Sequence, residues 1–415
     1  MGEILDLAER AWQGSYDKHW HPSGAQEEIA PNLFFLHTFA NVSIARTAAG
    51  LVLVDTGSHI GRSQTFHAVR QCDPGPVFAS IYTHGHVDHA FGLPPFLAEA
   101  REKSWERMRI IGHRNVGPRF DRYRATSGYN SAINTRQFSV PVPWPIEFDY
   151  PDMTYDESLQ LDAGGSVFEL HHARGETDDH TWIFWPQRKV LFTGDQFIWV
   201  TPNAGNPQKV QRYAADWAQS LRIMSKCEAE VLVPGHGLPI FGVSRVRQAL
   251  DETADWLEHL LRETLERMNA GLALDTILHE VKPPTELADR PYLQPVYDEP
   301  EFVVRNIWRL YGGWYDGTPS HLKPAPEAQL GREVASLAGG VRALVARARE
   351  LATVDDLTLA SHLADWAVAA APEDRDAHAA RAEIYAARAK SERALMTRGV
   401  FGAAARESDQ KSGRT

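Results

Sequence analysis

The stretch Thr83-His84-Gly85-His86-Val87-Asp88-His89 decides how the whole chain is interpreted. It places three histidines and one aspartate within six consecutive residues, directly after the apolar run 77–82, which is typical of a strand. A strand that enters a glycine-containing turn can direct alternating side chains toward one point. Imidazole nitrogens and carboxylate oxygens are ligands of Zn(II) and Fe(II), and two pairs of such residues indicate two metal ions.

Three distant residues favour this metal site over a polar turn that contains structural histidines. They are Glu176 in Arg-Gly-Glu-Thr-Asp, Asp195 in Phe-Thr-Gly-Asp and His236 in Val-Pro-Gly-His-Gly. Each of them follows a strand-like run, and strand ends from different parts of a chain often meet at one edge of a sheet. The sequence therefore predicts that these residues join the first cluster.

Taken in this order, the motifs resemble those of the metallo-β-lactamase superfamily over about residues 30–240, and Asp55 in an Asp-Thr-Gly turn matches the family as well. The resemblance implies an α/β protein with an αββα sandwich, in which sheet packs on sheet and helices lie outside. It also implies two metal sites, in which the ligands are His84, His86 and Glu176 for one metal, Asp88, His89 and His236 for the other, and Asp195 as the bridge. Most members of the superfamily carry His at the position of Glu176.

This resemblance implies a cofactor of two divalent metal ions, Zn(II), with Fe or Mn as alternatives. Such ions bind a water molecule and lower its pKa, so that a metal-bound water or hydroxide becomes the nucleophile or the base. Asp88 both ligates a metal and orients that water in this scheme, and it is the predicted catalytic residue.

Three further stretches resemble the alkyl sulfatase branch of the superfamily, the type III sulfatases. They are the loop 173–179, the segment 302–319 with Tyr311-Gly-Gly-Trp-Tyr-Asp-Gly-Thr-Pro, and the Ala-rich helices that follow it. The branch implies cleavage of alkyl sulfate esters and an all-α helical dimerisation domain, hence a homodimer. Its best-known members carry Glu at the position of Asp195.

A sulfate monoester needs cationic or neutral hydrogen-bond donors for its oxygens, and arginine suits such oxyanions well. Two stretches rich in arginine, tyrosine and asparagine flank the metal motifs. The predicted substrate-binding residues, all for a small anionic ester, are Arg122, Tyr123, Tyr129, Asn130, Arg212 and Tyr213.

With 415 residues, the chain is expected to form more than one domain. The predicted divisions are a catalytic domain 1–275, a connecting arm 276–325, a helical dimerisation domain 326–405 that resembles tetratricopeptide hairpins, and a disordered tail 406–415. Periodicity predicts helices at 244–268, 331–352, 356–371 and 376–396, whereas residues 114–158 read as a long irregular stretch.

Composition narrows the class of protein. The formal charge of −11 argues against nucleic-acid binding, and no apolar run is long enough for a membrane helix. Two cysteines, Cys72 and Cys227, form no disulfide framework, and the first residues do not form a signal peptide. We therefore expect a cytoplasmic protein with neither nucleic acid nor membrane as a partner.

Two other functions remain open at the level of sequence. A hydrolase of a lactone, thioester, phosphodiester or β-lactam would use the same metals with a different pocket. A non-catalytic scaffold would keep the fold and use its helices, and loss of a metal ligand would indicate it. All seven ligand residues are present.

Overall fold

The computed structural model describes residues 2–16 and 21–414, and the chain divides into two compact units. The sandwich unit contains Met1–Ser127, Pro145–Leu272 and Thr276–Tyr311. The helical unit contains Gly128–Trp144, Ala273–Asp275 and Gly312–Thr415.

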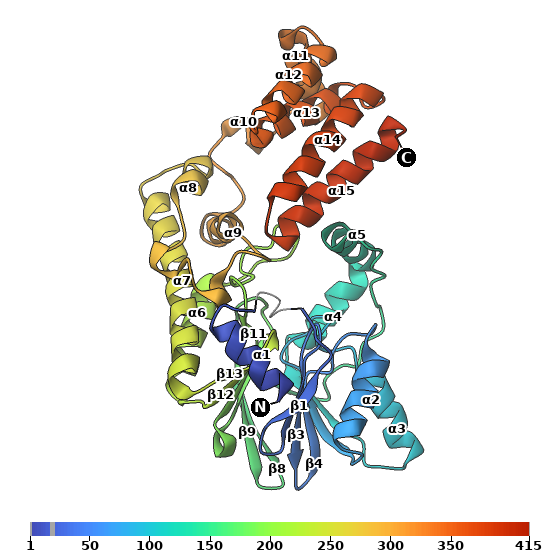
Figure 1. Ribbon diagram of the computed structural model, residues 1–415, viewed down its shortest axis with the longest axis vertical. Coiled ribbons are helices and arrows are strands. Elements are labelled where there is room, and N and C mark those ends of the chain that lie inside the picture. Colours follow the sequence, from blue (N-terminus) through green and yellow to red (C-terminus); the bar gives the residue numbers. More distant parts are fainter. Residues whose placement is uncertain (1, 17–20, 415) are drawn as a thin grey trace. The chain divides into compact units, whose positions relative to one another are not determined.

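The first sheet of the sandwich unit has seven strands that lie side by side in chain order (Figure 1). They are β1 (Gln26–Ala30), β2 (Leu33–Leu36), β3 (Val42–Thr47), β4 (Gly50–Val54), β5 (Val77–Ile81), β6 (Arg109–His113) and β7 (Met153–Tyr155). Strands β1 to β4 pair antiparallel, and β4 to β7 pair parallel. In β5, Val77, Ala79 and Ile81 are buried, and Ser80 on its other face is buried too. Burial of both faces explains why this strand reads as a nearly continuous apolar run.

The second sheet has six strands in the order β13-β12-β11-β10-β9-β8. They are β8 (Ser158–Ala163), β9 (Ser166–His172), β10 (Thr181–Trp185), β11 (Val190–Ile198), β12 (Val231–His236) and β13 (Ile240–Phe241). Strands β11 and β12 pair parallel, and their register is irregular between Phe192 and Gly194 and again before Ile198. Such an irregularity re-aims the side chains of a strand, and Asp195 lies within it.

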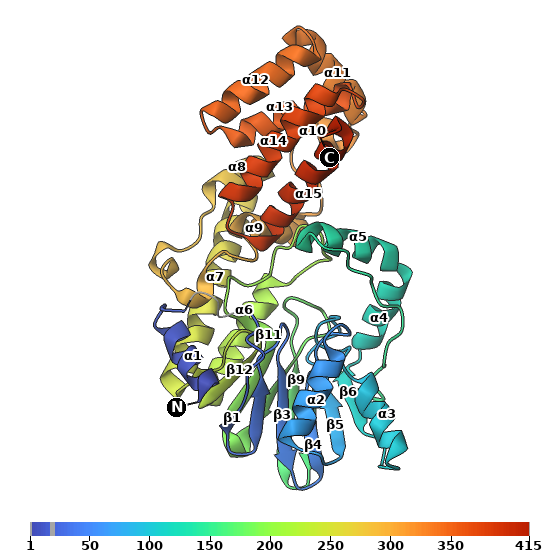
Figure 2. The ribbon, with the colours of Figure 1, turned by 45° about the vertical axis from the view of Figure 1, so that its right-hand side comes forward.

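Helices flank both sheets of the sandwich unit (Figures 1 and 2). Helices α2 (Arg62–Cys72) and α3 (Pro94–Glu102) lie beside the first sheet, and α6 (Ala214–Met224) and α7 (Val243–Asn269) lie beside the second. The periodic apolar side chains of α7 are buried. Among the residues that the structure describes, the remaining helices of this part are α1 (Glu3–Trp12), α4 (Val116–Ala125), α8 (Leu274–Glu280) and α9 (Pro300–Gly312), with four short 3-10 turns at Pro186–Arg188, Ser225–Cys227, Thr285–Leu287 and Pro291–Leu293. The predicted αββα fold class is confirmed.

The stretch 114–158 is more regular than its sequence indicates. It contains α4 and α5 (Ser127–Phe138), and only the following segment up to residue 152 lacks helix and strand. Three of the four buried side chains of α5 are polar, namely Asn130, Asn134 and Gln137. A helix that buries polar side chains shows little apolar periodicity, which is why the sequence pattern misses α5. Helix α4 does bury apolar side chains at helical spacing, and the prediction overlooked that pattern.

The helical unit contains α10 (Pro319–Leu322), α11 (Glu327–Ala338), α12 (Val341–Thr353), α13 (Leu357–Ala370), α14 (Arg375–Ser391) and α15 (Leu395–Ser412). Its core consists mainly of alanine and leucine, including Ala335, Leu344, Ala367 and Ala380. The predicted helix 331–352 is two helices, because Gly339 and Gly340 adopt positive φ angles of 87° and 112° and turn the chain.

The segment 406–415 also differs from its predicted disorder, because α15 continues to Ser412. Its buried positions carry small side chains, among them Ala405 and Ser408. Arg381 of α14 donates from Nη1 to Ser408 Oγ (2.9 Å) and to the carbonyl of Ala404 (3.1 Å). Small polar side chains hide the packed face of this helix from a search for apolar periodicity.

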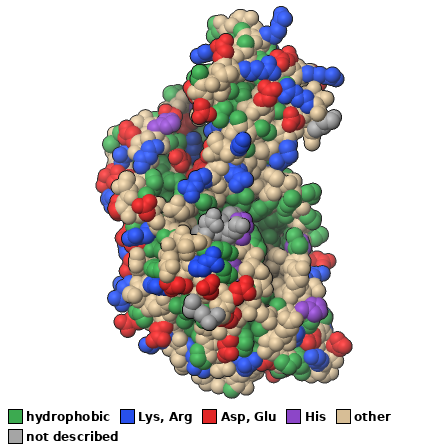
Figure 3. Space-filling model, in the orientation of Figure 1, with side chains coloured by type: hydrophobic (Ala, Val, Ile, Leu, Met, Phe, Trp, Pro, Cys, Tyr) green, Lys and Arg blue, Asp and Glu red, His purple; other side chains and the backbone are tan. Residues whose placement is uncertain are grey.

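The lengths of the helices and the charges on the surface are relevant to binding of a membrane or of nucleic acid. Within the described ranges, no helix is both long and apolar enough to cross a membrane. On the face drawn in Figure 3, Lys and Arg side chains are interspersed with Asp and Glu side chains. A mixed surface of this kind is typical of a protein with no continuous basic patch for nucleic acid on that face.

Candidate metal centre

The seven predicted ligand residues come from both sheets and form two groups. His84, His86, Asp88 and His89 lie in the loop after β5, Glu176 in the β9–β10 loop, Asp195 within β11 and His236 at the end of β12. One group contains His84, His86, Glu176 and Asp195, and the other contains Asp88, His89 and His236. Within each group, the ligand atoms lie within 4.8 Å of one another. The structure thus brings together every residue of the predicted set.

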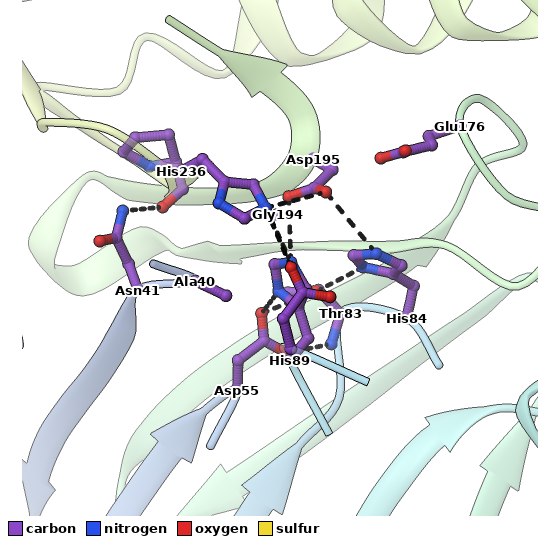
Figure 4. Close-up of polar contacts among 12 residues, drawn as sticks. Ala40, Asn41, Asp55, Thr83, His84, His89, Glu176, Gly194, Asp195 and His236 are labelled. Carbon is purple, nitrogen blue, oxygen red and sulfur yellow. Dashed lines mark hydrogen bonds and ion pairs between the residues drawn. The ribbon is translucent and has the colours of Figure 1, made fainter. Parts of the chain in front are cut away.

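Asp195 lies between the two groups (Figure 4). Its Oδ2 is 3.7 Å from His84 Nε2 and 3.4 Å from His236 Nε2, and its Oδ1 is 3.3 Å from His89 Nε2. Ligand atoms around a tetrahedral ion with bonds of 2.0–2.1 Å are separated by about 3.4 Å. This spacing supports the predicted bridging role of Asp195, which stays a prediction.

Several buried atoms at this centre have no hydrogen-bond partner. They include His84 Nε2 and Glu176 Oε2. Buried polar atoms are paired in most proteins, so two such atoms in a single group call for another partner. A nitrogen lone pair and a carboxylate oxygen are acceptors, and a cation fits both.

The electrostatics of the centre also suit cations. Burial lowers the pKa of His84 and of His86 well below the usual range, which leaves both imidazoles in the neutral form that binds metals. Burial acts in the same direction on His236, but Asp195 opposes it and raises the pKa to about 8. Burial raises the pKa of Glu176 to about 8, against the opposing effect of Arg212. At neutral pH, Glu176 therefore holds a proton in the metal-free protein, and a bound cation would displace it.

Groups behind the ligands set their orientation. Asp55 Oδ2 accepts hydrogen bonds from His89 Nδ1 (2.8 Å) and Thr83 Oγ1 (2.8 Å), and its Oδ1 accepts from Thr83 N (2.8 Å). His180 Nε2 accepts from the backbone N–H of Asp195 (3.0 Å), and His236 Nδ1 pairs with the carbonyl of Phe39. Partners of this kind fix the ring orientation and tautomer of a metal ligand.

We expect Asp55→Asn to weaken metal binding about 10–100-fold, as loss of such a partner does elsewhere. Asp55 adopts a left-handed φ of 59°, which asparagine also tolerates, so the backbone can stay in place. The amide offers one acceptor oxygen where the carboxylate has two, and His89 or Thr83 loses its acceptor. Competition with a chelator measures the affinity. An affinity equal to that of the control Asp162→Asn, at an exposed position in β8, would contradict the prediction.

A second layer of charge lies beside Glu176. Arg212 Nη1 donates to Glu176 Oε1 (2.5 Å) and to the carbonyl of Asn203 (2.5 Å), and Asn203 Nδ2 donates to the same Glu176 oxygen. Arg212 is 3% exposed, and its Nε has no hydrogen-bond partner. Lys209 of the same loop is half-buried, and burial together with Arg212 lowers its pKa to about 8. Arg212 and Lys209 therefore bring positive charge to this side of the centre.

The six predicted substrate residues are placed differently. Arg212 contacts Glu176, while Tyr213 is half-buried with the guanidinium carbon of Arg174 4.7 Å from its ring centre. Tyr123 is buried on α4, and the guanidinium carbon of Arg122 lies 5.6 Å from its ring centre. Two others belong to the helical unit, where α5 carries Tyr129, which is exposed, and Asn130, which is buried. Substrate binding by these residues stays a prediction.

The sequence did not predict an ion pair that supports the loop after β5. Arg119 is buried and pairs through Nε with Asp179 Oδ2 (2.8 Å), which also accepts from the backbone N–H of Gly85 (2.9 Å). Arg119 thereby supports the turn that carries His84 and His86. Arg119 and Asp179 are recognisable in the sequence as charged residues close to the metal motifs. No local pattern, however, indicates that two residues this far apart in the chain form an ion pair.

The fold and the centre together define a metalloprotein with an αββα sandwich. A model of the metallo-beta-lactamase superfamily matches residues 37–236, which include all seven ligand residues, and a model of alkyl sulfatase dimerisation matches residues 273–411. The chain is 29% identical over 361 residues to a linear primary-alkylsulfatase from Pseudomonas sp. (strain ATCC 19151), and the match covers 81% of the chain and 68% of that relative.

Other relatives agree with these matches. An (R)-specific secondary-alkylsulfatase from Pseudomonas sp. is 28% identical over 392 residues, covering 86% of the chain and 58% of that protein. The solved structure of the sec-alkylsulfatase Pisa1 from Pseudomonas sp. has the same fold, with a TM-score of 0.84 at 24% identity over 94% of the chain and 66% of that structure. The chain thus spans between about half and two thirds of the length of several relatives. It belongs to the metallo-β-lactamase superfamily, in the alkyl sulfatase branch that carries the dimerisation domain.

Proposed function

We propose that this protein is a binuclear metal-dependent hydrolase that cleaves alkyl sulfate esters. The observation that carries the proposal is the buried Glu176–Arg212 pair beside the ligand groups, in a chain whose relatives are named as alkylsulfatases. A sulfate ester is an anion whose oxygens need fixed positive charge. A buried guanidinium supplies that charge from a position that is already set before the substrate binds, so the protein does not have to rearrange.

The residues present fit two divalent ions, and we propose Zn(II), with Fe or Mn as alternatives. His84, His86 and Glu176 would hold one ion, Asp88, His89 and His236 the other, and Asp195 both. When bound, two such ions supply Lewis acidity and a water molecule of lowered pKa. The histidine and carboxylate donor set is one that Zn(II), Fe(II) and Mn(II) all accept.

The side chains of the chain have separate tasks in this proposal. Asp88, with 23% of its side chain exposed and its Oδ2 3.5 Å from His236 Nε2, is the carboxylate that orients the attacking water and accepts its proton. Asp195 stays ionised, because His236 and His89 outweigh burial and hold its pKa well below the usual range. Arg212 supplies the positive charge that holds the sulfate group of the ester at the centre.

Metal analysis combined with a sulfate-release assay tests the function. We expect two metals per chain and release of inorganic sulfate from alkyl sulfates. His84→Ala is expected to lose bound metal and to lose sulfate release. Two metals without sulfate release at any chain length would indicate a hydrolase of another ester class. Failure to bind Zn(II), Mn(II) or Fe(II) after reconstitution would indicate a scaffold.

We also propose a homodimer formed through the helical unit. The dimerisation model covers this part of the chain, and large apolar side chains are exposed there, among them Trp314 (68%), Leu337 (81%) and Leu330 (47%). Exposed apolar groups of this size are typical of an interface. Light scattering coupled to size-exclusion chromatography tests it, and a mass of one chain at micromolar concentration contradicts it.

A further inference from the structure

The segment Thr276–Tyr311 is the first part of the predicted connecting arm 276–325, and we call this shorter segment the arm from here on. It belongs to the sandwich unit, although the model of alkyl sulfatase dimerisation also matches it. It runs along the loop 201–212, which we call the anion loop because it carries Asn203 and Arg212. Both side chains bond Glu176 Oε1. The residues that hold this loop therefore bear on the metal centre.

Asp298 of the arm holds the first part of the anion loop. Its side chain is completely buried, and its Oδ2 accepts a hydrogen bond from the backbone N–H of Gly205 (2.6 Å). Its own carbonyl accepts from Thr201 Oγ1 (3.0 Å). A Cβ at Gly205 would lie 2.2 Å from the backbone nitrogen of Val303, so the two backbones are in direct contact. This contact leaves the loop little freedom to shift.

Asn306 holds both ends of the segment that separates Asn203 from Arg212. Its Nδ2 donates to the carbonyl of Ala204 (2.7 Å) and to the carbonyl of Arg212 (3.0 Å). Its own carbonyl accepts from Gln211 Nε2 (3.0 Å). Asn306 is 7% exposed, so these hydrogen bonds are not open to exchange with solvent. One side chain thus fixes the spacing of two residues that contact Glu176.

We propose that Asp298 and Asn306 are positioning residues for the metal centre: they hold the anion loop so that Arg212 and Asn203 keep Glu176 in its ligating place. They touch neither metal nor substrate, and they act through Arg212. The inference rests on the proposed function for the anion that Arg212 receives, while its effect on metal affinity does not depend on the ester.

The arm has a second anchor that serves as a matched control. Arg290 pairs with Glu252 of α7 through Nε (2.6 Å) and Nη2 (2.8 Å). This anchor also ties the arm to the rest of the sandwich unit, and its two partners lie outside the anion loop. Arg290→Gln therefore reports what a purely structural loss of an arm contact does.

The test uses Asn306→Asp in the full-length protein, a change that keeps the shape and removes both donors. Metal-free protein is titrated with Zn(II) against a chelator, and Zn-loaded protein is titrated with inorganic sulfate by calorimetry. Loss of two buried hydrogen bonds is expected to weaken Zn(II) binding at one of the two sites and to weaken sulfate binding, each about tenfold. In Arg290→Gln, both constants stay within about twofold of the parent protein.

A double variant shows whether Asn306 acts through Arg212. In the Arg212→Met background, Asn306→Asp is expected to cause no further loss of Zn(II) or sulfate affinity, because Asn306 acts by holding the Arg212 side chain, which that variant lacks. Additive losses, or affinities in Asn306→Asp equal to those in Arg290→Gln, overturn the proposal. If Asn306→Asp does not fold, Asp298→Asn replaces it with the same expected outcome.

The outcome for the arm is separable from that of the proposed function. If the parent protein binds two Zn(II) ions but releases no sulfate, and Asn306→Asp binds Zn(II) more weakly, the positioning role of Asp298 and Asn306 is supported and the sulfatase function is rejected. If the parent protein releases sulfate, and Asn306→Asp keeps the Zn(II) affinity, the positioning role is rejected and the sulfatase function is supported. Thermal unfolding of each variant accompanies these titrations as the measure of global stability.

Discussion

Asp195→Asn is expected to lose both metal ions and to lower turnover more than about a thousandfold, which corresponds to several kcal/mol of transition-state stabilisation. Asp195 contacts His84 of one group and His89 and His236 of the other at 3.3–3.7 Å. An amide keeps the shape of the side chain but removes its charge, and its NH₂ group cannot act as a ligand. Neither group would then retain its shared carboxylate.

Elemental analysis after dialysis, together with the sulfate-release assay, measures this result. The matched control is Asp156→Asn, because Asp156 is 64% exposed and pairs with the equally exposed Arg114 at 2.9 Å. A surface pair of this kind contributes little to stability, and the control should keep both metals. Two metals in Asp195→Asn with turnover within about tenfold of the parent protein would rule out the bridging role.

Arg212→Met is expected to lower kcat/KM for an alkyl sulfate about a hundredfold, mainly through a higher KM. A charge-assisted hydrogen bond to a buried oxyanion contributes about 1.5–3 kcal/mol, and this change removes one from the substrate and one from Glu176. The metal-free protein should also lose about 1–3 kcal/mol of stability, because Glu176 takes up a proton once Arg212 is gone and the carbonyl of Asn203 loses its donor. Bound metal would contact Glu176 in place of that proton, so the loss should be smaller in the loaded protein.

Steady-state kinetics and chemical denaturation, with and without metal, measure both effects. Arg245→Met is the control, since Arg245 and Glu9 form an ion pair in which each side chain is 36% exposed. Its removal should cost less than about 1 kcal/mol and leave the kinetics unchanged. Equal kinetic constants in the two variants would mean that Arg212 does not receive the substrate anion.

The parts of the fold that could be predicted from sequence are those in which one face or one run is apolar. The buried strand β5 and the long amphipathic helix α7 show such patterns and were placed within one or two residues. Helices α5 and α15 were missed, because their packed faces carry mainly asparagine, glutamine, serine and other small side chains. Helix α4 was missed although Val116, Phe120 and Tyr123 recur on it at helical spacing. Burial of those residues depends on partners elsewhere in the chain, and no local pattern reveals it.

The candidate site divides in the same way. All seven ligand residues lie in short motifs, and the structure brings them into two groups. Arg212 was predicted near the substrate, but its bond to Glu176 was not. Tyr129 and Asn130 lie in the helical unit, and their predicted role in substrate binding stays a prediction. A motif specifies which atoms are offered, whereas a contact requires that two distant segments pack together.

Short local motifs are enough to show which metal-binding groups the chain offers: imidazoles and carboxylates at the ends of strands, in the order found in the superfamily. The contacts that hold these groups in place become visible only in the folded chain. Asp298 and Asn306 lie some 90 residues or more from the loop residues that they bond. The reason is physical, because side-chain alternation along a strand is local, while a buried hydrogen bond between distant segments exists only after the core has packed.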